Sequence, residues 1–278
     1  MVDLHSHSTV SDGSDPPARI PELAAAAGCS AVALTDHDRL DGLAEARARA
    51  GALGVELVPG CEVSCDWAPG TLHVLVYFVE PGEGPLQDEL TRLQEDRAER
   101  NRRMVERLSA AGLPVTLDEL EAEAGGEGAG RPHMAAILVR KGVVGSVQEA
   151  FDRYLARGRP AYVSKARLSA RTVAEEARGS GGVAVLAHPL SLQLGETDLD
   201  STVAELADAG LSGLEALYGR YSPEERAGLA AMAERHGLVT TGGSDYHGTF
   251  KPDLSVGTGR GDLCVPDSAL VTLAERRP

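Results

Sequence analysis

Short apolar runs rich in β-branched residues alternate with Ala-, Glu- and Arg-rich stretches along most of the chain. Such runs are typical of strands buried on both faces of a parallel sheet. They predict strands at about residues 1–5, 31–35, 55–59, 72–78, 183–187, 213–217 and 239–243. The spacing of apolar positions between them predicts helices at 16–27, 39–52, 170–180, 198–209 and 223–236. Alternating strands and helices indicate βα units, so we expect an α/β fold with a parallel sheet, one unit short of the common eight-stranded barrel.

Residues 86–168 break this alternation, because they contain no clear strand and much helical character. Residues 86–111 are predicted to form one long polar helix, and a Gly-rich break at 125–130 precedes a further helical run. We therefore expect a barrel domain made of residues 1–85 and 169–278, with a helical insertion subdomain at 86–168 that covers the active site. The insertion would lie between the fourth and fifth strands.

Composition places the chain among ordinary globular proteins. It has 278 residues, of which 42% are hydrophobic and 25% charged. No apolar stretch approaches the roughly 18 residues of a membrane helix, and the N-terminus has no signal-peptide pattern, so we expect a cytoplasmic protein without membrane association. The four cysteines do not indicate a disulfide scaffold in a chain of this size, and we expect buried or unreactive thiols. The oligomeric state is left open.

The net charge of −15 argues against a surface that coats DNA or RNA. The charge is unevenly spread, since residues 86–168 hold 14 basic and 13 acidic side chains, whereas the remainder holds 13 basic and 29 acidic ones. Bound divalent cations would offset part of the acidity of the remainder. The nearly neutral middle segment is the better place to receive an anionic substrate.

Five short motifs place His, Asp and Glu just past predicted strand ends. They are Asp3-Leu4-His5-Ser6-His7 with Asp12, Thr35-Asp36-His37-Asp38, Gly60-Cys61-Glu62, Ala187-His188-Pro189 and Ser244-Asp245-Tyr246-His247. In a parallel barrel the carboxyl ends of all strands open on one face, so these side chains should surround one mouth. His73 lies within a strand and would have to point into the barrel.

This set of donors is too large for one ion. Imidazole nitrogens with carboxylate oxygens suit Zn, Fe or Mn, and a carboxylate such as Glu62 can bridge two ions. Closely spaced ions activate water and stabilise a phosphoryl displacement, so the pattern indicates a metal-dependent hydrolase. A lone His near a strand end is usually structural, and His236, before Gly237, is interpreted as a helix C-terminal residue. We expect Asp36 and Asp38 to support ligands or face solvent.

In combination, the motifs resemble the polymerase-and-histidinol-phosphatase (PHP) superfamily, in particular its stand-alone bacterial phosphoesterases. The resemblance implies a distorted (β/α)7, TIM-like barrel with three divalent metal ions, most often Mn, with Zn, Fe or Mg as other choices. It implies one ion at His5, His7, Glu62 and Asp245, a second at Glu62, His73 and His188, and a third at Asp12, His37 and His247. His188 is preferred over His133 for the second ion because its Ala-His-Pro context matches the family's ligand motif.

The middle segment resembles the branch of this superfamily that acts on nucleotides and short RNA. The matching residues are Arg97-x-x-Arg100-Asn101-x-x-Met104, Gly130-Arg131-Pro132-His133 and Ala161-Tyr162-Val163-Ser164-Lys165. The resemblance implies that Arg131, His133 and Lys165 bind substrate. Arg131 offers a planar fork and Lys165 a compact charge for phosphate. His133, His247 or a metal-bound water would protonate the leaving group, and this choice stays open. Tyr162, Tyr218, Tyr221 and Phe250 are candidate platforms for a base.

The resemblance implies a phosphoesterase that releases the 3′-phosphate of nucleoside 3′,5′-bisphosphates, and that also degrades short 5′-phosphorylated RNA, by means of metal-activated hydroxide at a trinuclear site. Three alternatives remain. Histidinol-phosphate phosphatase belongs to the same superfamily, although Gly-Arg-Pro-His argues against it. A proofreading nuclease would need a separate polymerase. A non-catalytic metal-binding or interaction module conflicts with competent ligands at all nine expected positions.

Overall fold

A computed structural model describes residues 1–124, 129–164 and 167–278, and Lys165 lies outside these ranges. Within them, seven strands form one sheet in the order β1 to β7. Their bounds are Val2–Asp3, Ala31–Leu34, Glu56–Cys65, Leu72–Tyr77, Val183–Leu186, Gly213–Tyr218 and Val239–Gly243. All seven predicted strands are therefore present, and the α/β prediction is confirmed.

The expectation that all strands run parallel is wrong for β4, which is antiparallel to both β3 and β5. Strand β3 continues past its predicted end to Cys65, and only the short segment 66–71 connects it to β4. A parallel pair needs a crossover connection of about a dozen or more residues, whereas a short connection reverses the chain. The remaining neighbours β1–β2, β2–β3, β5–β6 and β6–β7 are parallel.

The sheet curls until β1 meets β7, which makes a nearly closed barrel. The Leu4 amide donates to the Gly242 carbonyl at 3.1 Å, and the Asp245 amide donates to the His5 carbonyl at 2.8 Å. A Cβ at Gly243 would lie 2.4 Å from the His5 amide nitrogen, so the closure requires glycine there. This junction brings the first and last motifs of the sequence together.

The predicted outer helices are present as α1 (Arg19–Ala26), α2 (Leu43–Leu53), α7 (Ala170–Gly179), α8 (Glu196–Asp208) and α9 (Pro223–Arg235). A further helix, α10 (Asp267–Ala274), was not predicted and packs on β7. Short 3-10 turns follow the β5 and β7 motifs at Pro189–Leu192 and Gly248–Phe250. His236 ends α9 before Gly237, whose φ is 66°, as the sequence predicts.

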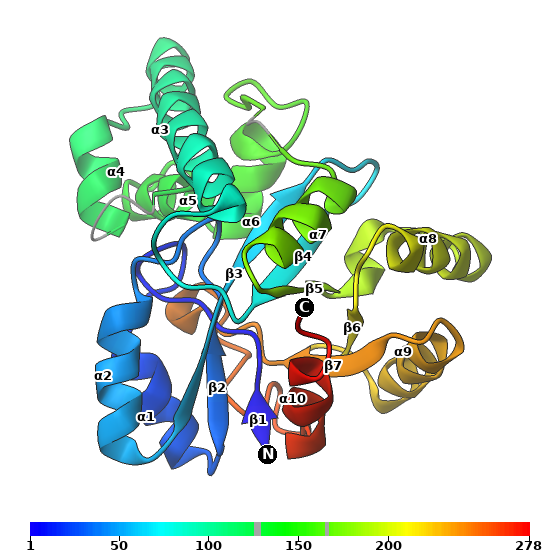
Figure 1. The fold of residues 1–278 in the computed structure, drawn as a ribbon. Helices are drawn as coiled ribbons and strands as arrows, with labels where there is room; N and C mark the ends of the chain where they lie inside the picture. The colour runs from blue at the N-terminus through cyan, green and yellow to red at the C-terminus, as the bar shows by residue number, and fades with distance from the viewer. Residues whose placement is uncertain (125–128, 165–166) are drawn as a thin grey trace.

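The middle segment forms α3 (Pro85–Ala110), α4 (Leu117–Ala124), α5 (Arg131–Arg140), α6 (Val147–Ala150) and a π-helical turn at Phe151–Leu155. Figure 1 shows these helices gathered at one end of the barrel. Leu86, Leu90 and Leu93 of α3 pack into the barrel core, whereas Met104 and Leu108 belong to a separate helical core. Helix α3 thus joins the two cores, and the domain boundaries at 85/86 and 168/169 stay a prediction.

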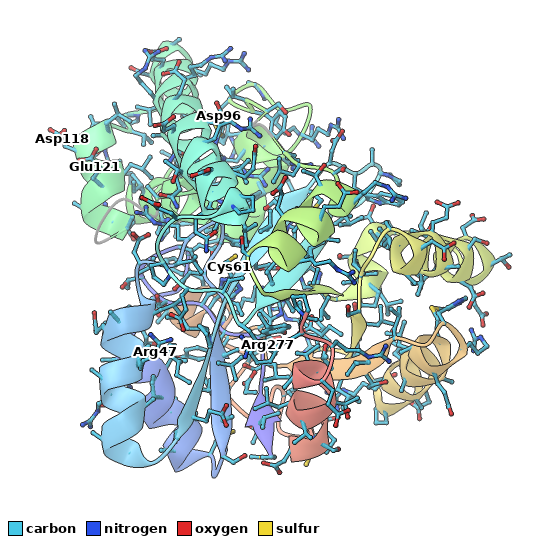
Figure 2. The ribbon with its side chains drawn as sticks, in the orientation of Figure 1. Arg47, Cys61, Asp96, Asp118, Glu121 and Arg277 are labelled. Atoms are coloured by element: carbon cyan, nitrogen blue, oxygen red, sulfur yellow. The ribbon has the colours of Figure 1, made fainter. Side chains whose placement is uncertain are left out.

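Acidic side chains project from helices of the middle segment, although that segment holds nearly equal numbers of basic and acidic residues. Figure 2 shows Asp96, Asp118 and Glu121 projecting from α3 and α4, while Cys61 lies inside. Cys29, Cys61 and Cys65 are buried free thiols and Cys264 is an exposed one, so burial is confirmed for three of the four. None of the helices in the described ranges is long and apolar enough to cross a membrane, and the cytoplasmic location stays a prediction.

Candidate metal centre

The barrel mouth holds a cluster of imidazoles and carboxylates from all five motifs and from β4. We call this set the His–carboxylate cluster; it comprises His5, His7, Asp12, His37, Glu62, His73, His188, Asp245 and His247. Most of these side chains are buried, and His5 and His7 are fully buried. Sequence positions as far apart as 5 and 247 therefore meet, as the parallel-barrel argument predicts for strand-end residues.

Glu62 lies at the centre of the cluster, on β3. Its Oε1 lies 2.8 Å from His73 Nδ1 and 2.9 Å from His188 Nε2. Its Oε2 lies 3.1 Å from His7 Nε2, 3.3 Å from His37 Nδ1 and 3.4 Å from His5 Nε2. The antiparallel turn of β4 brings His73 into this group, because His73 pairs with Ser64 of β3, two residues beyond Glu62. One carboxylate thus faces five imidazoles, the arrangement expected of a ligand shared between ions.

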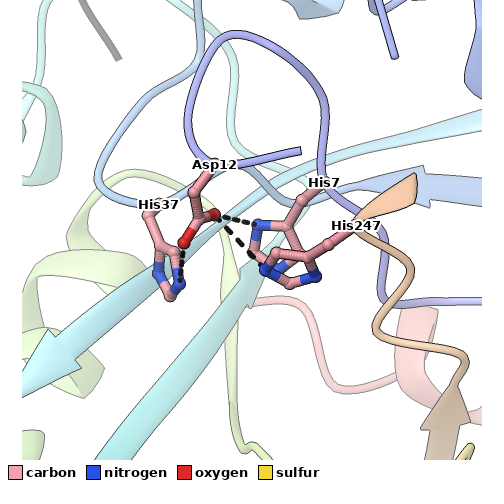
Figure 3. Close-up of side chains that lie close together, drawn as sticks. All are labelled: His7, Asp12, His37 and His247. Atoms are coloured by element: carbon pink, nitrogen blue, oxygen red, sulfur yellow. Dashed lines mark ion pairs between the residues drawn. The ribbon is translucent and has the colours of Figure 1, made fainter. Parts of the chain in front are cut away.

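Asp12 forms a second focus, which Figure 3 shows between His7, His37 and His247. Its carboxylate oxygens lie 3.3 Å from His247 Nε2, 3.7 Å from His7 Nδ1 and 3.8 Å from His37 Nε2. Three sets have ligand atoms within 4.8 Å of one another: His7, Asp12, His37 and His247; His5, His7, Glu62 and Asp245; and His37, Glu62 and His73. His188 lies outside these sets and reaches the cluster through Glu62.

The tautomers of the histidines show that the cluster fits cations. The Nδ1–H of His5 is held by Glu215 Oε1 at 2.8 Å, and that of His247 by the Asp245 carbonyl at 2.9 Å. In the neutral rings, their Nε2 atoms then carry lone pairs that face Glu62, Asp245 or Asp12. Asp245 Oδ1 and His37 Nδ1 are buried and have no hydrogen-bond partner among the described residues. Electron-pair donors that face one another in a buried site are satisfied by a shared metal ion.

Electrostatics keep the carboxylates ionised. Burial alone would raise the pKa of Glu62, but neighbouring imidazoles, chiefly those of His37 and His73, hold it well below its usual range. Burial would likewise raise the pKa of Asp245, and Lys251 and His5 hold it well below its usual range. Both groups are therefore anionic near neutral pH, the state in which a carboxylate binds metal.

The imidazoles respond in opposite directions to the same surroundings. Burial would lower the pKa of His7, but the adjacent Asp245 and Glu62 outweigh it and raise that pKa to about 9. Burial dominates at His37 and lowers its pKa to about 3. Positive charge in the cluster is thus favoured where carboxylates are densest, at His5 and His7 beside Glu62 and Asp245.

Asp36 and Asp38 support the cluster from behind, as expected for residues that flank a ligand. Asp36 accepts hydrogen bonds from the Ser8 amide and hydroxyl at 2.8 and 2.7 Å and from the Ser11 hydroxyl at 2.6 Å. These bonds fix the loop that carries His7 and Asp12. Asp38 is fully buried and pairs with Arg97 of α3, which ties the helical segment to the barrel mouth.

Two charged residues that position the cluster escaped sequence analysis. Glu215, fully buried on β6, accepts from the His188 amide at 2.8 Å in addition to His5. A lone acid inside the apolar run 213–217 was the available signal. Lys251 donates to Asp245 Oδ2 at 2.5 Å, next to the Tyr218 hydroxyl, which donates to the same oxygen at 2.7 Å. No sequence pattern marks Lys251, because it follows the last motif in an irregular loop.

Three residues of the His- and Asp-containing motifs adopt left-handed backbone conformations. Their φ angles are 57° at Asp38, 25° at His188 and 54° at Asp245. Non-glycine residues avoid this region, and where they occupy it the surrounding contacts must hold them there. At Asp245 the bonds to Tyr218 and Lys251 provide that restraint, and the bond from the His188 amide to Glu215 provides it at His188. At His188 and Asp245 the strained backbone turns the side chain toward the cluster.

Two cavities border the cluster and share His37, Thr71 and His73 in their walls. The larger, of about 530 Å³, is lined on its far side by Leu190, Tyr218, Arg220 and Tyr221. The smaller, of about 210 Å³, is lined by Asp12 and by Arg97, Arg100, Arg131, Tyr162 and Arg167. Of the candidate base platforms, Tyr218 and Tyr221 therefore line the larger cavity and Tyr162 the smaller.

Arg131 and His133 begin α5 beside the smaller cavity. The Arg131 guanidinium lies over the rings of Phe151 and Tyr162, 5.6 and 5.8 Å from their centroids. His133 Nδ1 accepts a hydrogen bond from the Gly130 amide at 3.0 Å, so its Nε2 carries the proton in the neutral ring. Burial lowers the pKa of His133, which favours this neutral form. The Phe250 ring packs edge-on against it, 5.2 Å between centroids.

Comparison with known proteins agrees with this geometry. Residues 3–122 match the PHP domain family. The chain is 36% identical to the 3′,5′-nucleoside bisphosphate phosphatase of Chromobacterium violaceum, over 92% of this chain and 90% of that protein. It is 34% identical to the 5′-3′ exoribonuclease Rnm of Escherichia coli, over 89% and 85%. A crystal structure from Bifidobacterium adolescentis, assigned as a metal-dependent phosphoesterase, superposes with a TM-score of 0.87 at 31% identity, covering 100% and 96% of the two chains.

Proposed function

Because this chain belongs to the PHP domain family and is a metal-dependent phosphoesterase, we propose that it releases the 3′-phosphate from nucleoside 3′,5′-bisphosphates. Short 5′-phosphorylated RNA is the proposed second substrate. Supporting this choice, relatives of more than 30% identity over most of the chain are a bisphosphate phosphatase and a 5′-3′ exoribonuclease. The observation that carries the proposal is the His–carboxylate cluster between a cavity of nucleoside size and a small arginine-lined one.

Three divalent ions, Mn in the first place, are proposed for the cluster. The first would be held by His5, His7, Glu62 and Asp245, the second by Glu62, His73 and His188, and the third by Asp12, His37 and His247. The ligand atoms of the first set lie within 4.8 Å of one another. The same holds for the third set when His7 is included. For the second, His73 and His188 both lie within 2.9 Å of Glu62 Oε1. When bound, such ions acidify a water molecule and neutralise phosphoryl oxygens.

The chain's own residues orient the substrate and supply a proton to the leaving oxygen. Arg131 is placed to hold phosphate oxygens with its planar fork, which charge-assisted hydrogen bonds make strong. His133, neutral and protonated on Nε2, is suited to donate a hydrogen bond to the oxygen that leaves. His247 is the other candidate donor, but its Nε2 faces Asp12, which favours His133 for this role. Lys165 stays a predicted phosphate contact.

The larger cavity is proposed to receive the nucleoside. Its volume of about 530 Å³ lies within the range of small-molecule sites. Leu190 and the ring of Tyr221 offer apolar surface for a base, and the Tyr221 hydroxyl is occupied by the Leu190 amide at 2.9 Å. Tyr218 is 7% exposed and committed to Asp245, so Tyr221 is the better stacking surface.

The test is phosphate release from adenosine 3′,5′-bisphosphate by Mn-loaded protein, with nucleotide products separated by chromatography. We expect conversion to adenosine 5′-monophosphate, and slower release of mononucleotides from a 5′-phosphorylated oligoribonucleotide. Faster hydrolysis of histidinol phosphate than of either nucleotide would overturn the substrate assignment. Full metal occupancy without hydrolysis of any phosphoester would instead indicate a non-catalytic metal-binding module.

A further inference from the structure

Lys251 is one of only three lysines among the 27 basic side chains of this chain, which otherwise uses arginine. Lys141 pairs with Glu119 at the surface of the middle segment, and Lys165 lies outside the described ranges. Lys251 instead lines the larger cavity together with His73, and its side chain is 25% exposed. Lysine differs from arginine in carrying a compact point charge with three hydrogen-bond donors, so a single ammonium group can serve two acceptors.

Asp245 divides its carboxylate between the His–carboxylate cluster and Lys251. Its Oδ1 lies 3.4 Å from His7 Nε2 and 3.5 Å from His5 Nε2. Its Oδ2 accepts hydrogen bonds from Lys251 Nζ at 2.5 Å and from the Tyr218 hydroxyl at 2.7 Å. The ammonium group therefore lies against the second oxygen of a proposed metal ligand, and at the same time it borders the larger cavity.

The ammonium group of Lys251 has donors left for a molecule in this cavity. Among the described residues, Asp245 is the one hydrogen-bond acceptor of Lys251 Nζ, so two N–H donors remain. The backbone of Lys251 is also fixed, because its amide donates to the Gly248 carbonyl at 3.2 Å and its carbonyl accepts from the Leu254 amide at 3.1 Å. Lys251 therefore presents its remaining donors from a defined position in the cavity wall.

Neutralising Asp245 does not by itself account for the charge of Lys251. Asp245 Oδ2 already accepts from Tyr218, and a divalent ion held through Oδ1 would compensate the carboxylate. The cluster and the adjacent Glu215 supply four carboxylates, whereas the three proposed divalent ions would carry six positive charges. The ammonium group would then be in excess of what its neighbours require, and a cation in excess beside a cavity attracts an anionic group.

We propose that Lys251 is a catalytic residue, which keeps its bond to Asp245 and donates a second hydrogen bond to a non-bridging oxygen of the phosphoryl group that is hydrolysed. The proposal rests on the proposed function and deepens it. In that reaction the oxygen of water bonds to phosphorus while the bond from phosphorus to the nucleoside oxygen breaks, and the proton that water loses balances the one that the leaving oxygen takes up. Lys251 stays protonated throughout, and its fixed ammonium group stabilises the charge on the phosphoryl oxygens in the transition state.

The test compares Lys251→Met with the wild-type protein, both saturated with Mn. We expect kcat for adenosine 3′,5′-bisphosphate to fall by about 100-fold, as for the loss of one fixed donor to the transition state. Inorganic phosphate should bind the variant about 10-fold more weakly in a calorimetric titration. Metal per chain, measured by mass spectrometry, should be unchanged. Lys251→Gln keeps a donor without the charge, so it should lose less activity, and it covers the case that Lys251→Met does not fold.

Tyr218→Phe is the matched comparison, because it removes the other hydrogen bond to Asp245 Oδ2 and leaves the cation in place. It should weaken Mn binding and leave phosphate binding to the Mn-saturated protein unchanged. Lys141→Met, which removes a surface lysine, should change neither quantity.

A residue that only positioned Asp245 would behave like Tyr218, so a loss of kcat in Lys251→Met that saturating Mn restores would overturn the proposal. Unchanged kcat or unchanged phosphate binding in both Lys251 variants would overturn it as well. A wild-type protein that hydrolyses no nucleotide would refute the proposed function, and phosphate binding would then still decide whether Lys251 contacts a phosphoryl group.

Discussion

The barrel mouth and the smaller cavity, whose arginine side chains (Arg97, Arg100, Arg131 and Arg167) we call the arginine pocket, contribute opposite charges to one site, and they hold them differently. In the His–carboxylate cluster, the side-chain atom that points away from the cluster centre is held by a hydrogen bond. Glu215 holds His5 Nδ1 in this way, and the Tyr218 hydroxyl holds Asp245 Oδ2. In the arginine pocket, side chains such as Arg131 and Arg100 lack carboxylate partners in the described chain and are held by packing on rings and apolar side chains. Hydrogen bonds therefore set the geometry of the side chains in the cluster. In the pocket, arginine side chains without a carboxylate partner in the described chain keep their positive charge available for a ligand.

This difference predicts two separate signatures. Changes at the cluster should remove metal and activity together, because its members share ligands and supporting bonds. Changes at the pocket should leave metal in place and alter substrate use, because guanidinium groups do not bind cations. A pocket variant that loses metal, or a cluster variant that changes only substrate use, would contradict this comparison.

Chelation should have the largest effect. Dialysis against EDTA should reduce phosphate release to background, and added Mn should restore it. Metal at about 100 times its dissociation constant stabilises a protein by about 2.7 kcal/mol, which for a chain of this size corresponds to a rise in Tm of roughly 5–10 °C. Differential scanning calorimetry with and without Mn measures it. Full activity after verified metal removal would exclude a catalytic role for the cluster's ions.

Glu62→Gln should come next, since Glu62 faces five imidazoles. We expect activity to fall by more than about 100-fold, the upper end of the effect of losing a ligand's supporting partner. Metal per chain, measured by mass spectrometry, should fall in the same variant. Glu56→Gln is the control on the same strand, because Glu56 is exposed at its other end. Unchanged metal content in Glu62→Gln would contradict the shared-ligand assignment.

Glu215→Gln should have an intermediate effect, because it weakens the support of His5 and of the His188 amide without removing a ligand. Metal affinity should fall about 10- to 100-fold, measured by titration of the metal-free protein with Mn. Saturating Mn should restore most of the activity. Lost activity that saturating Mn does not recover would show that Glu215 acts other than by positioning ligands.

Arg131→Lys should lower kcat/KM for adenosine 3′,5′-bisphosphate by about 10-fold, because lysine keeps the charge but loses the planar fork and its stacking on Phe151 and Tyr162. Metal content should stay at the wild-type value in this variant. A parallel loss of metal would mean that the pocket and the cluster are one cooperative unit, contrary to the comparison above.

His236→Gln should have the smallest effect. His236 lies at the end of α9, 3.1 Å from Asp200 and away from the cluster. We expect activity within about twofold of wild type and a change in the free energy of unfolding of at most about 0.5 kcal/mol, typical of exposed pairs. Urea unfolding and the phosphate-release assay measure both. A large loss of activity would show that the sequence motifs do not distinguish histidines that bind metal from histidines that are only structural.

The sequence determined the strands and most helices, because the periods of apolar positions reflect which faces are buried. It also selected the histidines and carboxylates that meet, because residues at the ends of successive barrel strands share one mouth. The direction of β4 was not encoded in its apolar pattern, and it follows from the short connection 66–71. The contacts of Glu215 and Lys251 depend on neighbours distant in the chain, and so does the burial of Arg100 without a carboxylate partner in the described ranges. Only the tertiary structure decides which charges lie together, because pairing and burial are properties of space rather than of sequence order.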